Sequence, residues 1–316
     1  MKKQPFVSVC LATYNRLEDL KNCLNALMAQ DYPKDRYEII LVEDGSKSGA
    51  KEFIMGAGKP PDIRHPTSDI KYFWQENKGA ARARNKAISK AKGEIIAFTD
   101  DDTVAPVNWL SSLVGGFARH PEVAAVGGIQ EEDQEELKRN PYARYDSWIT
   151  REFYGAKDKE IKGGFEVPTG GTNNIAYKKE ILDKYGVFDP YFGIVAPGVL
   201  IAGEDPDLKK RVCTAGEQFL YIPLKVIHRR KFNLKGLAKQ SWTRGLGIIH
   251  FAKKHQDEPL PTRAEIYFQL LKLPLATLKS LILTKDKTLV WPQFIDRLFT
   301  IKGQLDYQRV VGKIKE

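Results

Sequence analysis

The sequence predicts an α/β protein in which a mostly parallel central sheet is flanked by helices and followed by a mainly helical C-terminal extension. Two observations predict this class. Over the first two-thirds of the chain, short apolar runs alternate with amphipathic segments of helix length, as in strands joined by crossover helices. Beyond residue 232 this alternation ends, and Leu, Lys, Trp and Phe dominate. We therefore expect an α/β domain at residues 1–231 and a helical extension at 232–316.

The individual elements follow from apolar spacing. Strands are expected at 6–12, 37–42, 72–74, 94–99 and 123–126, and helices at 17–29, 79–92 and 106–119. Pro106 suits the first position of the last of these helices. The segment from about 130 to 165 is polar and aromatic without a clean period. It begins with an acidic cluster that we interpret as a solvated loop or helix face, namely Glu131, Glu132, Asp133, Glu135 and Glu136.

The composition narrows the class of protein. The chain has 316 residues with 50 basic and 40 acidic side chains, a net charge of +10, and 42% hydrophobic residues, which excludes a disordered chain. Three sparse cysteines indicate a reducing compartment, so we expect a cytoplasmic protein. Charged residues interrupt every long apolar run, and a membrane-spanning helix is not expected. The positive charge suits phosphate-bearing ligands or an anionic membrane, but no nucleic-acid-reading motif accompanies it.

Three consecutive aspartates follow the expected strand at 94–99. Side chains alternate along an extended chain, so Asp100 and Asp102 would point the same way. Carboxylates that lie so near one another repel unless a cation neutralises them. Mg2+ or Mn2+ accepts oxygen ligands of this kind. The alternative is an exposed acidic turn before the next helix.

Other candidate residues lie near the ends of predicted elements. Asp44 follows a second strand and could share the crevice at the carboxyl ends of the strands, although Asp-Gly is also an ordinary turn pair. Arg84 lies on a basic helix that could hold a pyrophosphate or could be a solvated face. Asp205 precedes Pro206 and is expected to be a helix N-cap, or else a general base. His228 could complete a metal site or have a structural role.

Six segments of the chain together resemble the family 2 glycosyltransferases of the GT-A fold. The resemblance covers Val7 to about Arg230 and rests on six segments in the family's order. They are VSVCLATYNR, YEIILVEDGS, NKGAARARNKAISKAKGEIIAFTDDD, GGTNNIAYKKEIL…GVFDPYF, GEDPDLKKRV and YIPLKVIH. The resemblance implies a nucleotide-diphospho-sugar donor and a divalent cation, Mn2+ or Mg2+. Neither a P-loop nor a GxGxxG motif is present.

The resemblance also implies roles for individual residues. The donor nucleotide-sugar would contact Thr13, Asn15, Glu43, Asp44, Arg84, Asp100 and Asp101. The metal would be held by Asp102 and His228, and Asp205 would be the catalytic base. Contacts to acceptor or sugar would come from Gly171, Thr172, Asn173 and Glu204. Two positions depart from the pattern, because Glu43 replaces the first of the usual two aspartates and Pro206 replaces a bulky residue.

The resulting hypothesis is a metal-dependent, inverting glycosyltransferase of the hexosyltransferase type. It would move a sugar, with UDP as the expected carrier, to a hydroxyl of a glycan or lipid-linked acceptor in cell-surface polysaccharide or glycolipid synthesis. One base, one metal and no covalent nucleophile favour a single displacement. An alternative is transfer from a GDP-sugar to a polyprenyl phosphate held by the cations at 229–231. A third hypothesis is a non-catalytic nucleotide- or polyanion-binding protein.

The extension leaves two partners open. On a helical projection, residues 265–283 have a narrow polar stripe and a broad apolar face. Such a face could pack on the α/β domain or on a second subunit in a homodimer. It could instead lie on an anionic membrane, which would make the protein peripheral at the inner face of the membrane.

Overall fold

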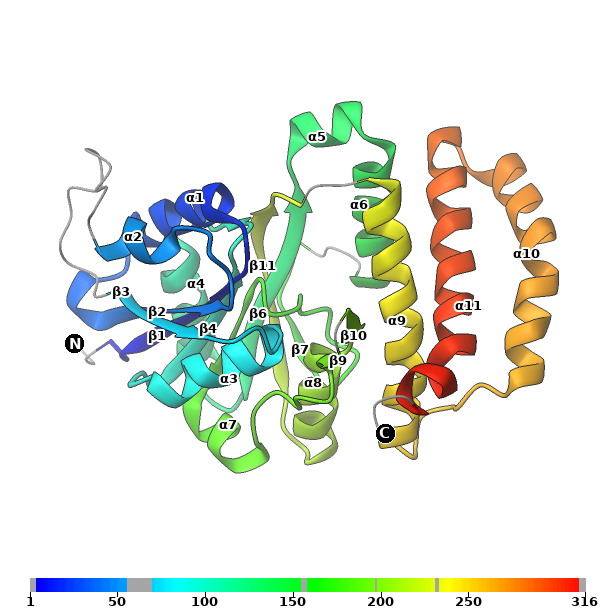
Figure 1. The fold of residues 1–316 in the computed structure, drawn as a ribbon. Coiled ribbons are helices and arrows are strands. Elements are labelled where there is room, and N and C mark those ends of the chain that lie inside the picture. Colours follow the sequence, from blue (N-terminus) through cyan, green and yellow to red (C-terminus); the bar gives the residue numbers. More distant parts are fainter. Residues whose placement is uncertain (1–3, 56–69, 155–157, 197, 231–232, 313–316) are drawn as a thin grey trace. The chain divides into compact units, whose positions relative to one another are not determined.

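A nine-stranded sheet is the framework of the first part of the chain (Figure 1). The computed structural model describes residues 4–55, 70–154, 158–196, 198–230 and 233–312. Within them the strands follow the order β3–β2–β1–β4–β8–β6–β11–β5, and β7 pairs with β11 beside this path. The strands are β1 (Val7–Thr13), β2 (Tyr37–Asp44), β3 (Ile70–Gln75), β4 (Ile95–Asp100), β5 (Thr103–Val104), β6 (Ala125–Glu132), β7 (Ile161–Gly163), β8 (Ile175–Lys178) and β11 (Phe219–His228).

The sheet has a parallel part and an antiparallel part. β1 pairs in parallel with β2 and with β4, and β2 pairs in parallel with β3. β8 runs antiparallel to both β4 and β6, and β11 runs antiparallel to β5 and β7. The four parallel strands end at one common edge, where the aspartates of β4 lie. This arrangement confirms the predicted α/β class.

Helices cover both faces of the sheet, so its central strands are buried on both sides. Along β1, Val9 and Leu11 pack in one apolar cluster with the helices α1 and α4, whereas Cys10 packs in a second cluster with α3, α7 and α8. Each such buried side chain contributes about 1.5–3 kcal/mol to folding. The helices of this region are α1 (Leu17–Met28), η1 (Lys34–Arg36), α2 (Ala50–Met55), α3 (Ala80–Lys90), α4 (Trp109–Arg119), α5 (Gln134–Arg139), α6 (Pro141–Tyr154), α7 (Lys179–Tyr185) and α8 (Glu204–Thr214).

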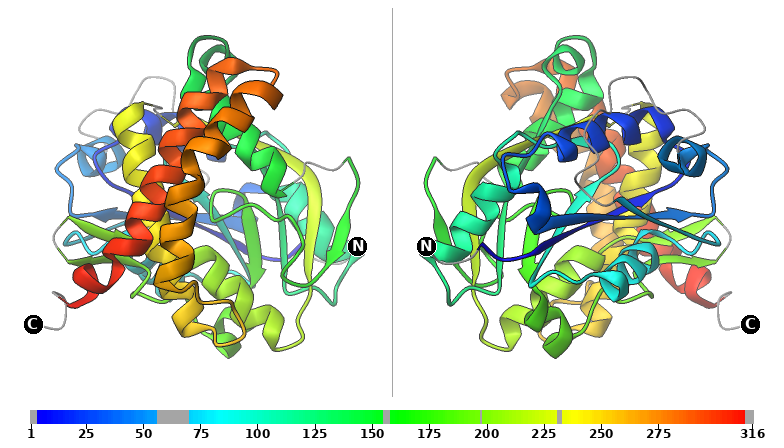
Figure 2. Two further views of the ribbon diagram at one scale, coloured as in Figure 1. Left: turned by 90° about the vertical axis from the view of Figure 1, so that its right-hand side faces the viewer. Right: turned by 90° about the vertical axis from the view of Figure 1, so that its left-hand side faces the viewer.

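The C-terminal part is helical, as predicted. α11 (Val290–Gly312) contacts both α9 (Leu234–Lys254) and α10 (Arg263–Leu283), and lies between them in Figure 1. Figure 2 shows the same helices after a turn of 90°. The short helix η2 (Lys287–Leu289) leads into α11, and the two-stranded ribbon of β9 (Gly193–Ala196) and β10 (Val199–Ile201) packs on α9. Leu246, Ile266 and Ile301 share an apolar cluster in this part.

Two compact units result from the described contacts, and they do not follow a single cut in the chain. The first comprises Met1–Glu131, Thr150–Asp189 and Asp205–Arg229. The second comprises Glu132–Ile149, Pro190–Glu204 and Arg230–Glu316. The expected boundary between residues 231 and 232 itself lies outside the described residues, and the division at that point stays a prediction.

Several local predictions were wrong. Pro106 is not the first residue of a helix, because α4 begins at Trp109 and Pro106 belongs to the preceding turn. Asp205 is not an N-cap, because α8 begins one residue earlier, at Glu204. The unperiodic middle segment contains α5 and α6, and Glu132 of its acidic cluster is buried rather than solvated. A membrane-spanning helix was not expected from the sequence. Among the described helices, however, α10 is long and apolar enough to cross a membrane, judged by length and composition only.

Candidate active site

The carboxyl ends of three parallel strands bring the predicted residues together. The register of β1 with β4 places Ala12 beside Asp100, and the register of β1 with β2 places Thr13 beside Glu43. Asn15 adopts a left-handed backbone conformation (φ 57°), which asparagine tolerates better than most residues, and it carries the chain from β1 to the start of α1. Polar side chains from different strands therefore meet at one edge of the sheet.

Asp101 and Asp102 are both buried at this edge and are held by the last residue of β1, Thr13, and by Arg16 just after it. Thr13 Oγ1 donates to Asp101 Oδ2 at 2.7 Å, and Arg16 Nη1 lies 3.3 Å from Asp101 Oδ1. The same guanidinium nitrogen also donates to Asp102 Oδ2. Burial and, to a lesser degree, the neighbouring aspartates raise the pKa of Asp101 to about 7, against the opposing effects of Arg16 and Thr13. Three carboxyl groups thus crowd at this edge, and a cation bound there would favour their ionised forms.

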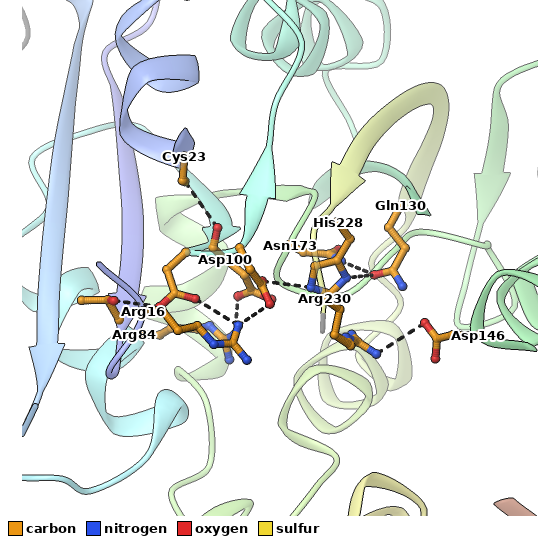
Figure 3. Close-up of polar contacts among 12 residues, drawn as sticks. Arg16, Cys23, Arg84, Asp100, Gln130, Asp146, Asn173, His228 and Arg230 are labelled. Carbon is orange, nitrogen blue, oxygen red and sulfur yellow. Dashed lines mark hydrogen bonds and ion pairs between the residues drawn. The ribbon is translucent and has the colours of Figure 1, made fainter. Parts of the chain in front are cut away.

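His228 reaches the aspartates from the antiparallel part of the sheet. β11 pairs with β5 so that His228 lies opposite Thr103, and the backbone N–H of Arg229 donates to Asp102 O at 2.7 Å. The His228 ring presents Nε2 to Asp102 Oδ1 at 3.0 Å and Nδ1 to Gln130 Oε1 at 3.1 Å. Gln130 Oε1 also accepts a hydrogen bond from Asn173 Nδ2 (Figure 3).

These side chains form a donor set that fits a divalent cation. One ligand atom each from Asp100, Asp102 and His228 lies within 4.8 Å of the others. Both nitrogens of His228 face oxygen acceptors, but a neutral imidazole carries only one N–H. A cation at Nε2 resolves this mismatch, with Nδ1 donating to Gln130 as histidine ligands commonly do to a carbonyl oxygen. The two carboxylates suit Mn2+ or Mg2+.

Arg84, on α3, pairs with Asp100 of this cluster. Its Nη2 donates to Asp100 Oδ1 at 2.7 Å, and its guanidinium lies 5.9 Å from the ring centre of Phe188. The arginine side chain is buried, so it is not the solvated basic face that the sequence left as an alternative. A buried arginine paired with a half-exposed aspartate fixes the orientation of that carboxylate.

The two acidic residues at the end of β2 are already engaged by the protein. Asp44 accepts hydrogen bonds from Gln75 Nε2 at 2.8 Å and from the backbone N–H groups of Lys78 and Gly79 at 2.9 and 2.8 Å. Glu43 accepts from Ser46, Ser48 and Tyr72. The pKa of Glu43 is lowered because these hydrogen bonds outweigh its burial. Both residues brace the strand end, and their predicted nucleotide contacts stay predictions.

Asp205 is linked to the histidine through the glycine-rich segment. Its Oδ2 accepts from the backbone N–H of Thr172 at 2.9 Å, and a Cβ at position 171 would lie only 2.5 Å from the same oxygen. Glycine at 171 therefore lets the backbone approach the carboxylate closely. The next residue, Asn173, contacts Gln130, which faces His228. Glu204 accepts from the backbone N–H of Gly203 at 3.3 Å and belongs to the second compact unit.

Two residues of this network were missed by the sequence analysis. Arg16 had a usable signal, because it ends the segment VSVCLATYNR that carries part of the resemblance. Gln130 had none, because the strand predicted at 123–126 ends before it and the next segment has no clear period, whereas in the structure it lies within β6. Of the cations at 229–231, Arg229 is exposed, and Lys231 lies outside the described residues.

The comparisons with known proteins agree with this geometry. Residues 8–186 match the family described as "Glycosyl transferase family 2". The chain belongs to this family. It is therefore a glycosyltransferase, and the hypothesis of a non-catalytic binding protein is not supported.

Two family relatives from Haloferax volcanii resemble the chain in sequence. Glycosyltransferase AglE is 30% identical over 215 residues, which cover 67% of this chain and 62% of AglE. The chain thus spans less than two-thirds of that relative's length. A glucosyl-dolichyl phosphate glucuronosyltransferase is 23% identical over 319 residues, covering 97% of this chain and 96% of the relative.

Two solved structures share the GT-A fold with this glycosyltransferase. The mannosyltransferase PcManGT from Pyrobaculum calidifontis, solved with GDP-Man and Mn2+, has a TM-score of 0.64 at 19% identity. The alignment covers 97% of this chain and 88% of that one. TarS 1-349 from S. aureus, solved with UDP, has a TM-score of 0.55 at 13% identity, with coverages of 96% and 91%. These similarities establish the fold predicted from the sequence.

Proposed function

We propose that this family 2 glycosyltransferase transfers a sugar from a nucleotide-diphospho-sugar to a hydroxyl group of a lipid-linked or glycan acceptor, with inversion and with Mn2+ or Mg2+. One observation carries the proposal. A continuous set of contacts connects Asp102 and His228 through Gln130 and Asn173 to the segment that holds Asp205. The candidate metal ligands and the candidate base thus belong to one network.

Asp102 and His228, with Asp100 beside them, would hold the cation. When bound, that cation supplies positive charge that offsets the negative charge developing on the leaving diphosphate. Arg16 and Arg84 orient the aspartates from two sides, so the ligand oxygens are positioned before the donor arrives.

Asp205 is the proposed base. As the acceptor oxygen forms a bond to the anomeric carbon, the bond from that carbon to the diphosphate oxygen breaks. The electron pair of the broken bond stays on the nucleoside diphosphate, and the hydroxyl proton passes to the Asp205 carboxylate. A single displacement of this kind inverts the anomeric carbon.

The nature of the acceptor is supported by a relative that matches along nearly the whole chain. Its name describes transfer of glucuronic acid to glucosyl-dolichyl phosphate, which offers a sugar hydroxyl on a lipid carrier. We therefore favour a lipid-linked sugar acceptor in glycolipid or polysaccharide assembly, at the inner face of the membrane. A GDP-linked donor is the competing choice, because a protein of similar fold was solved with GDP-Man.

Calorimetric titration of UDP and GDP, each with Mn2+ and with a chelator, tests the donor site. We expect metal-dependent binding of UDP, and Asp102→Ala should abolish it while the surface variant Asp183→Asn leaves it unchanged. Metal-dependent binding of GDP instead would reassign the donor and favour the polyprenyl-phosphate reaction. If folded protein binds neither nucleotide, the donor site is wrong.

Substitution of Asp205 tests the base. Asp205→Asn should lower turnover by about 10²–10⁴-fold, because an amide cannot accept the proton, while nucleotide affinity stays at the wild-type value. The measurement is nucleotide release with a lipid-linked glucose acceptor. Wild-type turnover in this variant would remove Asp205 from the mechanism.

A further inference from the structure

Helix α10 carries apolar side chains on two opposite sides. Ile266, Leu273 and Ser280 are buried and recur every seven residues, so they form one stripe along the helix. This stripe faces the rest of the second unit, where Ile266 shares a cluster with residues of α9 and α11. One side of α10 is therefore an ordinary packed surface.

The other side of α10 exposes large apolar residues along the full length of the helix. They recur at spacings of three and four residues and so lie on one face: Tyr267, Leu271, Leu275, Leu278 and Ile282. The exposed fractions are 76% for Leu271, 70% for Leu275 and 70% for Ile282. Monomeric soluble proteins seldom expose a continuous apolar face of this kind unless it binds something. We call these five residues the α10 apolar face.

The charges beside this face are almost all positive. Lys272 and Lys279, seven residues apart, form a column along one edge, and Lys272 Nζ lies 3.9 Å from the ring centre of Phe268. Lys285 and Lys287 follow the end of the helix, and Asp286 between them pairs with Arg144 at 3.3 Å. The single acidic residue of α10, Glu265, is used in the capping box with Thr262. A cationic edge beside an apolar face complements anionic lipid headgroups above acyl chains.

Aromatic residues and the helix packing favour a helix that lies in the membrane surface rather than one that crosses it. Trp291, the second residue of α11, is 55% exposed and stacks on Phe294 with ring centres 5.4 Å apart. Tryptophan is typical of the boundary between headgroups and acyl chains. Crossing the membrane would strip the buried stripe from its partners, whereas lying flat preserves it. Lysine side chains can extend from the edge to the headgroups.

We propose that the α10 apolar face binds an anionic lipid bilayer, with α10 lying in the interface and its buried stripe still packed on the second unit. This inference deepens the proposed location at the inner face of the membrane. It rests on α10 and the residues that follow it and does not depend on the donor site.

Vesicle flotation with the full chain tests the inference. The probes are vesicles of phosphatidylcholine alone and of phosphatidylcholine mixed with phosphatidylglycerol. The wild-type protein should bind the mixed vesicles more strongly, and the double variant L271E/L275E should lose about 10-fold or more in binding, because two exposed leucines no longer enter the apolar layer. K272E/K279E should reduce binding toward the level seen with neutral vesicles. Val107→Glu, a comparably exposed control in the first unit, should bind as wild type.

Two results would overturn the inference. Vesicle binding that is unchanged in L271E/L275E would show that another surface contacts lipid. A dimeric wild-type protein that becomes monomeric in L271E/L275E, with neither form binding vesicles, would assign the α10 apolar face to a second copy of the chain. Metal-dependent nucleotide binding is measured on the same samples. Loss of vesicle binding with nucleotide binding intact concerns only α10, and the reverse concerns only the proposed function.

Discussion

Gln130 is positioned to control how His228 presents its ring. Its Oε1 faces His228 Nδ1 at 3.1 Å and accepts from Asn173 Nδ2, so the amide oxygen is oriented toward the ring. With Nδ1–H donating to this oxygen, the lone pair of Nε2 would be directed toward Asp102 and the proposed cation site. Gln130 would thus be a positioning residue, one step removed from the metal.

Gln130→Leu is therefore expected to weaken Mn2+ binding by about 10–100-fold, because the imidazole loses the acceptor that fixes its tautomer. The measurement is calorimetric titration of Mn2+ into the nucleotide-free protein, which does not depend on turnover. Gln134→Leu removes an exposed glutamine four residues away and serves as the control. Equal Mn2+ affinity in Gln130→Leu and wild type would assign Gln130 a packing role only.

Lys209 gives a prediction for the pH dependence of stability. Its ammonium group contacts Thr169 Oγ1 at 3.1 Å and lies 5.7 and 5.4 Å from the ring centres of Phe165 and Phe219. Burial lowers the pKa of Lys209 to about 8. In the unfolded chain a lysine titrates near its ordinary value of about 10.4. Between these two values the unfolded state binds more protons than the folded state, so the free energy of unfolding rises with pH.

We therefore expect the wild-type protein to gain roughly 2–3 kcal/mol between pH 8 and pH 10.5 from this residue, a contribution absent below pH 8. Lys209→Met should flatten that part of the profile. The measurement is denaturant unfolding at several pH values, with the exposed Lys51→Met as the control. A profile for Lys209→Met that matches wild type would contradict the prediction.

At the residue scale, the sequence predicted the members of the site better than their contacts. Asp100, Asp102 and His228 carry recognisable signals, since each follows or ends an apolar strand. The contact between Asp102 and His228 joins residues 126 positions apart, and it depends on the pairing of β11 with β5. Arg16 likewise meets the aspartates only because β1 and β4 are neighbours. Such contacts follow from the sheet order, which local patterns do not specify.

Helices α9 and α11 approach closely through glycines, which gives a prediction at the scale of elements. A Cβ at position 245 would lie 2.1 Å from Thr300 O, and one at position 303 would lie 2.1 Å from Trp242 O. Both neighbours are backbone atoms that cannot rotate away. Replacement by alanine must therefore push the two helices apart.

Gly245→Ala and Gly303→Ala are each expected to lower the free energy of unfolding by about 1–3 kcal/mol or more, although alanine favours a helix over glycine. Gly312→Ala is the matched control, because no atom lies within 4 Å of its Cβ position. It should be neutral or slightly stabilising. Thermal and denaturant unfolding measure all three, and stabilisation by Gly245→Ala would mean that the helices are not in close contact.

Element boundaries show where sequence patterns fail. The strands at the sheet centre were predicted to within about two residues because their apolar runs are continuous and buried on both faces. The starts of α4 and α8 were wrong, since proline is compatible both with a first helical turn and with the turn before it. α6 was missed because its buried residues, such as Tyr145, pack on α9 and α11, and this partner surface is not encoded locally.

The whole molecule combines two compact units built from interleaved segments. A hydrogen-bond network inside the second unit explains why an early segment joins the C-terminal helices. Asp296 of α11 is buried and accepts from Tyr145 OH at 2.7 Å and from Ser241 Oγ at 2.6 Å, and Arg244 lies 3.0 Å from it. A carboxylate buried with these partners ties α6 to α9 and α11. A boundary drawn from the change in composition could not anticipate this return of the chain.

Nucleotide with Mn2+ and anionic vesicles, the two proposed ligands, should slow backbone hydrogen exchange in different segments of the chain. Nucleotide with Mn2+ should slow hydrogen exchange at the carboxyl ends of β1 and β4 and around His228, because a ligand that binds only the folded site suppresses local opening there. Anionic vesicles should instead protect α10 and the segment from Lys285 to Lys287. Hydrogen-exchange mass spectrometry of the full chain, with each ligand alone and with both, measures the two patterns.

The variants assign each pattern to its cause. In Asp102→Ala, protection by nucleotide should disappear while protection of α10 by vesicles persists, and L271E/L275E should give the reverse. Vesicles that protect β1 and β4 but leave α10 exchanging as in solution would place the lipid contact in the first unit and contradict the role of the α10 apolar face. Nucleotide protection that survives Asp102→Ala would show that the donor is held without the cation, by the strand-end residues alone.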